Sequence, residues 1–190
     1  KQPLDWDLSD GEPLPVRRKQ RTLARAATVK GPGTFFHKSI RTVTIEPTEM
    51  QGWWFERTDV RDALPFAVSP RNVWTTGDVV SNIVLRAGPP HNYVRMVEHI
   101  IALRAGLAID NVLIKIDAGD PPLFSRGSMD LVEAFDAAGV REVDAPARYC
   151  TVSERVSIVS PGGSFLIIDP CDPAKPALTL DCAVDFPTAI

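Results

Sequence analysis

A glutamate and a histidine stand side by side in an otherwise apolar stretch of the sequence. Glu98 and His99 lie within MVEHIIALRAGLAIDN, residues 96–111, where apolar residues recur at helical spacing and predict a helix buried on most of its surface. Neighbouring helix positions are about 100° apart, so both side chains can face one cleft. The imidazole would bind a metal ion while the carboxylate accepts a proton from metal-bound water. The alternative is a buried histidine that hydrogen-bonds to the backbone.

The residues before this helix predict strands. Residues 1–15 are rich in proline and acidic side chains, and we expect an extended or disordered tail. Residues 21–30 predict a strand that turns at a Gly-Pro-Gly sequence, and residues 40–45 predict its returning partner. Further strands are predicted at residues 52–57, 72–74 and 79–85. Three tryptophans in this region predict packing at the sheet edge or core, with sugar or nucleotide stacking as the alternative: Trp53, Trp54 and Trp74.

A strand and a second helix are expected after residue 110. Residues 111–117 alternate apolar and polar side chains, which is typical of a strand. Ser128 predicts a helix N-cap, and Asp130 would favour the positive end of that helix. The buried stripe is expected to consist of Leu131, Phe135 and Ala138, and the helix to end at Gly139.

The chain changes character near residue 147, after which only strands are predicted. These are residues 148–159, 164–168 and 178–184, with a turn at residues 161–163. We therefore divide the chain into a flexible tail (1–18), an α+β domain (19–146) and the first strands of an incomplete second domain (147–190). Strands cluster around two helices without a βαβ alternation. The predicted fold is a mostly antiparallel sheet packed on two helices in two layers.

Composition excludes several classes of protein. The net charge is -3 and the pI is about 5.6, which argues against nucleic acid as a partner. No apolar run approaches the length of a transmembrane segment. The three cysteines lack metal-ligand spacing and are odd in number, so we expect a reducing, cytoplasmic location: Cys150, Cys171 and Cys182.

The helix sequence around Glu98 resembles a family signature. The run MVEHIIALRAGLAIDN is similar to that of the UDP-3-O-acyl-N-acetylglucosamine deacetylases (LpxC), zinc enzymes of lipid A biosynthesis. Three other runs resemble landmarks of the same family in the same order: KQRTL from Lys19, WFERTDV from Trp54 and PPLFSRGSMDLVEAFDAAGV from Pro121. The resemblance covers residues 19–190.

The resemblance implies a zinc-dependent hydrolysis of the acetamide of a sugar-nucleotide lipid substrate. Glu98 would be the general base and His99 one zinc ligand, and Ser81 and Asn82 would lie beside the metal as substrate-binding residues. In the family, a histidine and an aspartate four residues apart complete the zinc site from the second domain, which would lie beyond Ile190. We therefore expect a companion polypeptide or a cleaved C-terminal half, and an inactive enzyme when this chain is alone.

The sequence also departs from the family pattern. The family has a threonine where Asn82 stands and an acidic residue where Arg126 stands, and the turn that contains His37 is longer than usual. His91 is expected on the surface of a loop. These departures leave open an alternative, a non-catalytic deacetylase-like interaction subunit.

Overall fold

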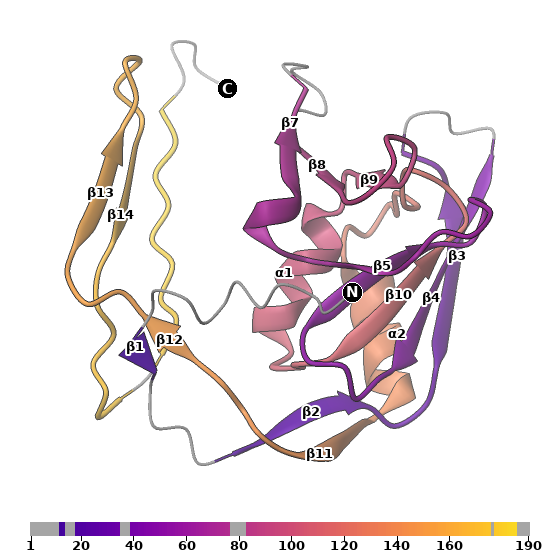
Figure 1. Ribbon diagram of the computed structural model, residues 1–190, viewed down its shortest axis with the longest axis horizontal. Coiled ribbons are helices and arrows are strands. Elements are labelled where there is room, and N and C mark those ends of the chain that lie inside the picture. Colours follow the sequence, from indigo (N-terminus) through magenta and orange to yellow (C-terminus); the bar gives the residue numbers. More distant parts are fainter. Residues whose placement is uncertain (1–11, 14–17, 35–38, 77–82, 176, 186–190) are drawn as a thin grey trace. The chain divides into compact units, whose positions relative to one another are not determined.

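The computed structural model describes residues 12–13, 18–34, 39–76, 83–175 and 177–185 (Figure 1). The chain divides into two compact units near residue 147. The first comprises the described residues from 18 to 147, and the second comprises residues 12–13 and those from 148 onward. Two of the residues expected in the flexible tail, Glu12–Pro13, form the short strand β1 of the second unit.

A five-stranded sheet forms one layer of the first unit. Its order is β3-β4-β10-β5-β6, and every neighbouring pair is antiparallel except β10 and β5. The alternating apolar residues of the β10 sequence place Val112, Ile114 and Ile116 on one fully buried face. The strands are β3 (Ala27–Pro32), β4 (Ile40–Pro47), β5 (Trp53–Arg57), β6 (Phe66–Ala67) and β10 (Val112–Ile116).

Two helices, α1 (Glu98–Gly106) and α2 (Met129–Ala138), form the second layer. Ile100 and Leu103 of α1 join the core against the sheet. The stripe predicted for α2 is buried as expected, with Leu131, Phe135 and Ala138 all in the core. The predicted α+β fold with a mostly antiparallel sheet on two helices is therefore confirmed (Figure 1).

The parallel pair β5 and β10 was not predicted. A chain that leaves β5 must cross over before β10 can run parallel to it, and α1 lies in this crossover. The expectation of no βαβ alternation was therefore wrong. The crossover also contains a separate three-stranded sheet. Because its short strands lie between β5 and α1 in the sequence, the βαβ unit could not be recognised from the order of predicted elements. These strands are β7 (Val73–Thr75), β8 (Ile83–Arg86) and β9 (Tyr93–Arg95).

The predicted strand at residues 21–30 is two strands. β2 (Lys19–Leu23) ends before β3 begins at Ala27, and it pairs with β11 (Val140–Pro146) rather than with the main sheet. The break contains two small residues, Ala24 and Ala26, and both are exposed. The chain thus turns from one sheet into the other within three residues.

A buried amide joins β2 to the main sheet. Asn111 is fully buried, and its Nδ2 donates to Gln20 Oε1 at 2.7 Å while its Oδ1 accepts from Gly52 N at 2.9 Å. Thr22 Oγ1 donates to the carbonyl oxygen of Asn111 at 2.7 Å. Buried polar groups need such complete pairing. Gln20, Thr22 and Asn111 belong to the family-like runs noted above, and their role here is to hold the fold together.

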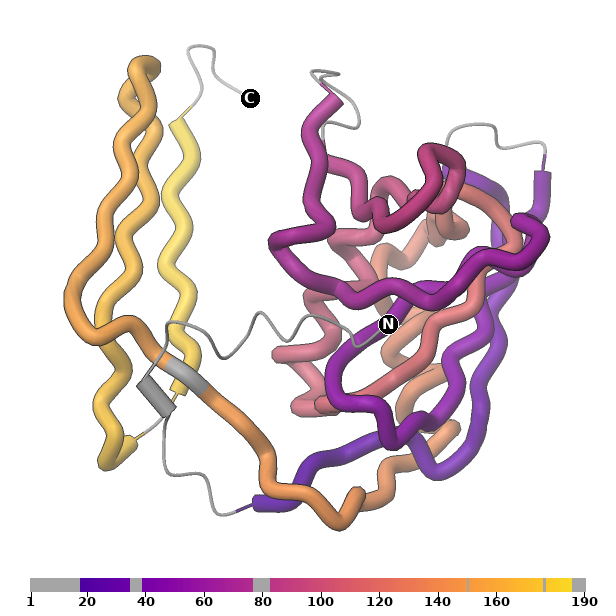
Figure 2. Tube along the Cα trace, viewed as in Figure 1, coloured from indigo at the N-terminus to yellow at the C-terminus, as the bar shows by residue number. Residues whose placement is uncertain are grey.

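The second unit contains a hairpin of β13 (Val156–Val159) and β14 (Phe165–Ile168), whose path is seen in the Cα trace of Figure 2. The predicted turn is confirmed, because Gly163 adopts a positive φ of 87° and its N–H bonds to Ser160 O. Residues 178–184 form no strand, contrary to expectation. The second short sheet pairs β1 with β12 (Cys150–Thr151).

The tryptophans divide between core and surface. Trp53 and Trp54 are buried, as the core interpretation predicts. Trp74 is 53% exposed, and the guanidinium of Arg86 lies 4.8 Å from its ring centroid. Trp74 lies on β7, an edge strand of the three-stranded sheet, so it fits the sheet-edge part of the prediction and not the core part. Within the described residues, no helix is long and apolar enough to cross a membrane.

Candidate functional site

Glu98 and His99 lie in the first turn of α1, and both are exposed. The expectation that this helix is buried on most of its surface was wrong. Only one side of α1 faces the sheet. Ile100 and Leu103 are buried there and Ile101 is partly buried, whereas Ala102 and Ala105 on the other side are exposed. An exposed histidine has no need of a backbone partner for its ring, so the buried-histidine interpretation does not apply.

The backbone before α1 turns sharply. β9 ends at Arg95, and Met96 then adopts a positive φ of 54°, which is uncommon for a residue other than glycine. Val97 is the N-cap, and its carbonyl oxygen accepts from Ile100 N and Ile101 N. Glu98 therefore stands at the N-terminal end of the helix, where the helix dipole favours a carboxylate.

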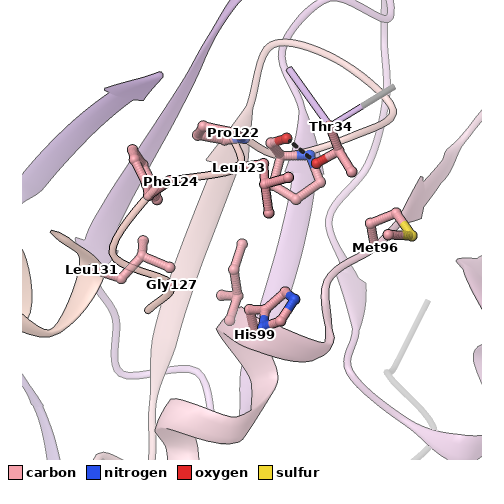
Figure 3. A pocket seen from close by; sticks show the side chains of 10 residues that line it. Thr34, Met96, His99, Pro122, Leu123, Phe124, Gly127 and Leu131 are labelled. Atoms are coloured by element: carbon pink, nitrogen blue, oxygen red, sulfur yellow. Dashed lines mark hydrogen bonds between the residues drawn. The ribbon is translucent and has the colours of Figure 1, made fainter. Parts of the chain in front are cut away.

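A small hollow lies beside the first turn of α1. It encloses about 30 Å³, which is roughly the volume of one water molecule, so it does not hold a whole sugar. Figure 3 shows the imidazole of His99 on one side and Thr34, Pro122 and Leu123 on the other. His99 lines the hollow and Glu98 does not, so the expectation of two side chains facing one cleft is not met here. The remaining lining residues are Met96, Ile100, Pro121, Phe124, Gly127 and Leu131.

The wall opposite His99 is fixed to the edge of the sheet. Thr34 Oγ1 donates to Pro121 O at 2.8 Å, and Leu123 N donates to Pro32 O at 2.9 Å. Gly31 lies so close to this wall that a Cβ added to it would be 2.8 Å from Cε1 of Phe124. Backbone hydrogen bonds and close packing thus hold the wall at a set distance from the β3 strand.

The start of α2 contacts the start of α1. Ser128 occupies the N-cap position, but its hydroxyl makes no capping bond and instead donates to His99 O at 3.4 Å. The predicted N-cap position of Ser128 is confirmed, but its hydroxyl bonds to the neighbouring helix instead of to the first turn of α2. This contact links the backbone of His99 to the end of the wall.

Arg126, which departs from the family pattern, lies in the loop before α2 and binds acidic residues of that helix. Its guanidinium bonds Asp130 Oδ1 at 2.9 Å and both carboxylate oxygens of Glu133 at 2.8 Å. The hydrogen bonds from Arg126 lower the pKa of Glu133, and those to Glu133 and Asp130 raise the pKa of Arg126. Arg126 and Glu133 are exposed and Asp130 is partly buried. The three side chains link the loop before α2 to the first turns of the helix and do not line the hollow.

The other predicted site residues are not brought together with His99. Ser81, Asn82 and His37 lie outside the described residues. His91 is exposed on a loop, as expected. In the described part of the chain, no three histidine, cysteine or carboxylate side chains lie close enough to hold a metal ion. The described residues therefore do not fit a complete zinc site, which takes at least three protein ligands.

Sequence reasoning missed one ion pair close to this region, in which the arginine is buried and the aspartate is exposed. Arg57 and Asp59 form a two-point ion pair at the end of β5, within the WFERTDV run that resembles a family landmark. The available signal was the spacing, because an arginine and an aspartate two residues apart at the end of a buried strand can pair side by side.

Comparison with known proteins gives a consistent result. The family model of UDP-3-O-acyl N-acetylglycosamine deacetylase matches residues 20–190. A Psychrobacter protein named UDP-3-O-acyl-N-acetylglucosamine deacetylase is 30% identical over 169 residues, which is 88% of this chain and 53% of that protein. A Campylobacter jejuni protein of the same name is 32% identical over 154 residues, 80% of this chain and 49% of its own length. The chain spans about half the length of the curated relatives it matches.

Proposed function

Because the chain belongs to the UDP-3-O-acyl N-acetylglycosamine deacetylase family, we propose that it supplies one part of a hydrolytic deacetylase of lipid A biosynthesis. The substrate is a sugar-nucleotide lipid of the UDP-3-O-acyl-N-acetylglucosamine type. The observation that carries this proposal is the position of Glu98 and His99, adjacent and exposed in the first turn of α1, with His99 beside the hollow. The reaction is expected in the cytoplasm.

Glu98 is proposed as the general base. It accepts a proton from the water whose oxygen attacks the carbonyl carbon of the acetamide. The carbon–nitrogen bond then breaks, acetate leaves, and the sugar amine takes up a proton. Exposure of Glu98 at a helix N-terminus supports this role, because water can reach the carboxylate and the helix dipole favours negative charge there.

Zinc is the proposed cofactor, with His99 as one of its ligands. When bound, such an ion polarises the carbonyl group and stabilises negative charge on its oxygen. The described residues do not complete the ligand set. We therefore propose that the other ligands come from a companion polypeptide or a C-terminal half, and we assign no step of the reaction to the metal.

The hairpin of the second unit supports the companion. Phe165, Leu166, Ile167 and Ile168 are between 42% and 70% exposed in four consecutive positions, so apolar side chains occupy both faces of β14. Exposed apolar surface of this kind is typical of an interface. Burial of such a face contributes about 25 cal/mol per Å², so the association should survive dilution and gel filtration.

The test is gentle purification from the native source. We expect a second polypeptide that carries a His-x-x-x-Asp pair, and an assembly that releases acetate from a UDP-3-O-acyl-N-acetylglucosamine substrate. Glu98→Gln in that assembly should lower turnover by about two to four orders of magnitude while the complex stays intact. Unchanged turnover of Glu98→Gln would remove Glu98 from the mechanism.

A second candidate is a non-catalytic interaction subunit with the deacetylase fold. It is favoured by the lack of a three-ligand group among the described residues and by the structural use of Arg126. This candidate predicts a complex without acetate release. It also predicts that Glu98→Gln and His99→Ala change neither assembly nor any activity of the complex.

A further inference from the structure

Arg57 lies where three segments of the first unit meet. It is the last residue of β5, and its side chain is 8% exposed. Nε donates to Asp59 Oδ1 and Nη2 donates to Asp59 Oδ2, both at 2.7 Å. Nη1 donates to Tyr93 O at 2.6 Å. A buried guanidinium needs hydrogen-bond partners for its N–H groups. Asp59 and Tyr93, which belong to different segments, supply them and hold Arg57 in one position.

The first of the segments held by Arg57 leads directly to Glu98 and His99. Tyr93 begins β9, and besides its carbonyl bond its ring centroid lies 5.5 Å from the guanidinium carbon. The strand ends at Arg95, and only Met96 and Val97 separate it from the helix. A shift of Tyr93 would therefore be transmitted to the first turn of α1 through a few backbone bonds.

The second segment leads to the wall opposite His99. Thr58 N donates to Ile116 O at 2.9 Å, and Arg95 N donates to Gly119 O at 2.8 Å. A Cβ added to Gly119 would lie 3.1 Å from Cε2 of Tyr93 and 3.3 Å from Nη1 of Arg57. The backbone at Gly119 is thus pressed against the stacked Tyr93 and Arg57 side chains, immediately before Pro121 and Pro122.

A second ion pair joins this arrangement to β4. Arg41 Nε donates to Asp120 Oδ1 at 3.2 Å, and Asp120 is 7% exposed. The positive charge of Arg41 also contributes to the lowered pKa of Asp59, after the larger effect of the hydrogen bonds from Arg57. Two ion pairs, Arg57 with Asp59 and Arg41 with Asp120, therefore lie on the segments next to the wall.

We propose that Arg57, oriented by Asp59, is a positioning residue that sets the first turn of α1 against residues 120–124. It holds β9 on one side and Gly119 on the other, so it fixes where His99 stands relative to the wall. The inference rests on the proposed function, because the position of the first turn of α1 matters for catalysis only if Glu98 and His99 act there. Lysine cannot replace Arg57, because an ammonium lacks the two-point geometry.

Amide hydrogen exchange of the 190-residue chain tests the positioning role without any need for activity. In Arg57→Lys, we expect the amide of Arg95 to exchange about tenfold faster or more, with amides of the first turn of α1 following it. The matched control is Arg18→Lys, which breaks a two-point pair with Asp110, at 2.6 and 3.0 Å, immediately before β2. It should leave the Arg95 amide unchanged. Equal effects of the two variants on Arg95 would overturn the proposal.

Substitution of two glycines, Gly119 and Gly106, gives a second test that does not depend on whether Arg57→Lys folds. Gly119→Ala should move the wall, because its Cβ meets Tyr93 and Arg57, whereas Gly106→Ala meets nothing within 4 Å. We expect chemical-shift changes at His99 and Thr34 for Gly119→Ala alone. Changes that stay within two residues of position 119 would contradict a positioning role.

Activity of the assembled enzyme gives the last measurement. Arg57→Lys should lower kcat by about tenfold with KM changed less than about twofold. The reason is that Glu98 and His99 would be displaced while the substrate-binding surface stays intact. An equal loss in Arg18→Lys would reduce Arg57 to a stabilising residue. If no assembly shows activity, the proposed function fails while the exchange result still decides whether Arg57 sets the position of α1.

Discussion

The indole of Trp53 stacks on the ring of Phe135 with centroids 5.8 Å apart and planes 11° from parallel. This contact joins β5 to α2, and Trp53 Nε1 also donates to Ile109 O at 2.9 Å. Both residues are fully buried. The stack is therefore the centre of the interface between the two layers of the first unit.

Phe135→Ala should destabilise the first unit by about 3–5 kcal/mol, because it removes a fully buried ring and leaves a cavity beside Trp53. Urea denaturation followed by tryptophan fluorescence measures this free energy of unfolding. Phe165→Ala is the control, since that ring is 70% exposed and its loss should cost less than about 0.5 kcal/mol. Similar losses for the two variants would contradict the central place of the stack.

Asn111→Ala should cost about 2–4 kcal/mol, because it leaves Gly52 N and Gln20 Oε1 buried without their partners. The same denaturation measurement applies. Asn72→Ala serves as the control: its amide donates a single bond, to Ala67 O at 2.8 Å in a partly buried position, and we expect a loss of about 1 kcal/mol. A smaller loss at Asn111 than at Asn72 would show that the network is not cooperative.

Asp59 should contribute to acid sensitivity. Hydrogen bonds from Arg57 lower its pKa from the ordinary value of 3.8, so its contribution to stability is complete above that value. The contribution is lost as the pH falls through the lower pKa of the folded state. Asp59→Asn should therefore be less stable than the wild type at neutral pH and should lose less stability on acidification.

Denaturation at a series of pH values would measure this difference. Asp62→Asn is a suitable control, because Asp62 and its partner Arg61 are 89% and 95% exposed and such pairs contribute little. A steeper loss of stability in acid for Asp59→Asn than for the wild type would contradict the assignment.

Zinc should bind weakly to this chain by itself, because the described residues offer His99 without two further ligands beside it. Equilibrium dialysis with metal analysis gives the stoichiometry and affinity. His99→Ala should then weaken binding in the assembled complex to the level of the isolated chain. Tight stoichiometric zinc in the isolated chain would contradict a site shared with a companion.

The sequence predicted the elements whose pattern is local. The alternation of Val112, Ile114 and Ile116 and the helical stripe of Leu131, Phe135 and Ala138 both follow from burial of one face, and both are confirmed. The parallel pairing of β5 with β10 was missed because it depends on partners about sixty residues apart in the chain, for which the sequence carries no local signal.

The site was less predictable than the fold. The helical spacing of Val97, Ile100 and Leu103 indicated one buried side of α1 correctly, but it could not show that the opposite side is exposed. Arg57 was missed because a buried cation is recognised by its partners, and Tyr93 and Gly119 are distant in sequence. Glu98 and His99 could be singled out because two adjacent functional groups in an apolar run are visible without any knowledge of tertiary contacts. Their roles as general base and zinc ligand stay predictions.

The β13 and β14 hairpin should make the isolated chain associate with itself at high concentration. Phe165–Ile168 is an uncharged run of aromatic and branched residues in an extended strand, the composition that favours ordered stacking of strands between molecules. We expect concentrated samples of the isolated chain to form thioflavin-binding fibrils seeded by this segment. Ile167→Lys should abolish them while leaving the unfolding of the first unit unchanged, so that fibril formation reports on the hairpin alone.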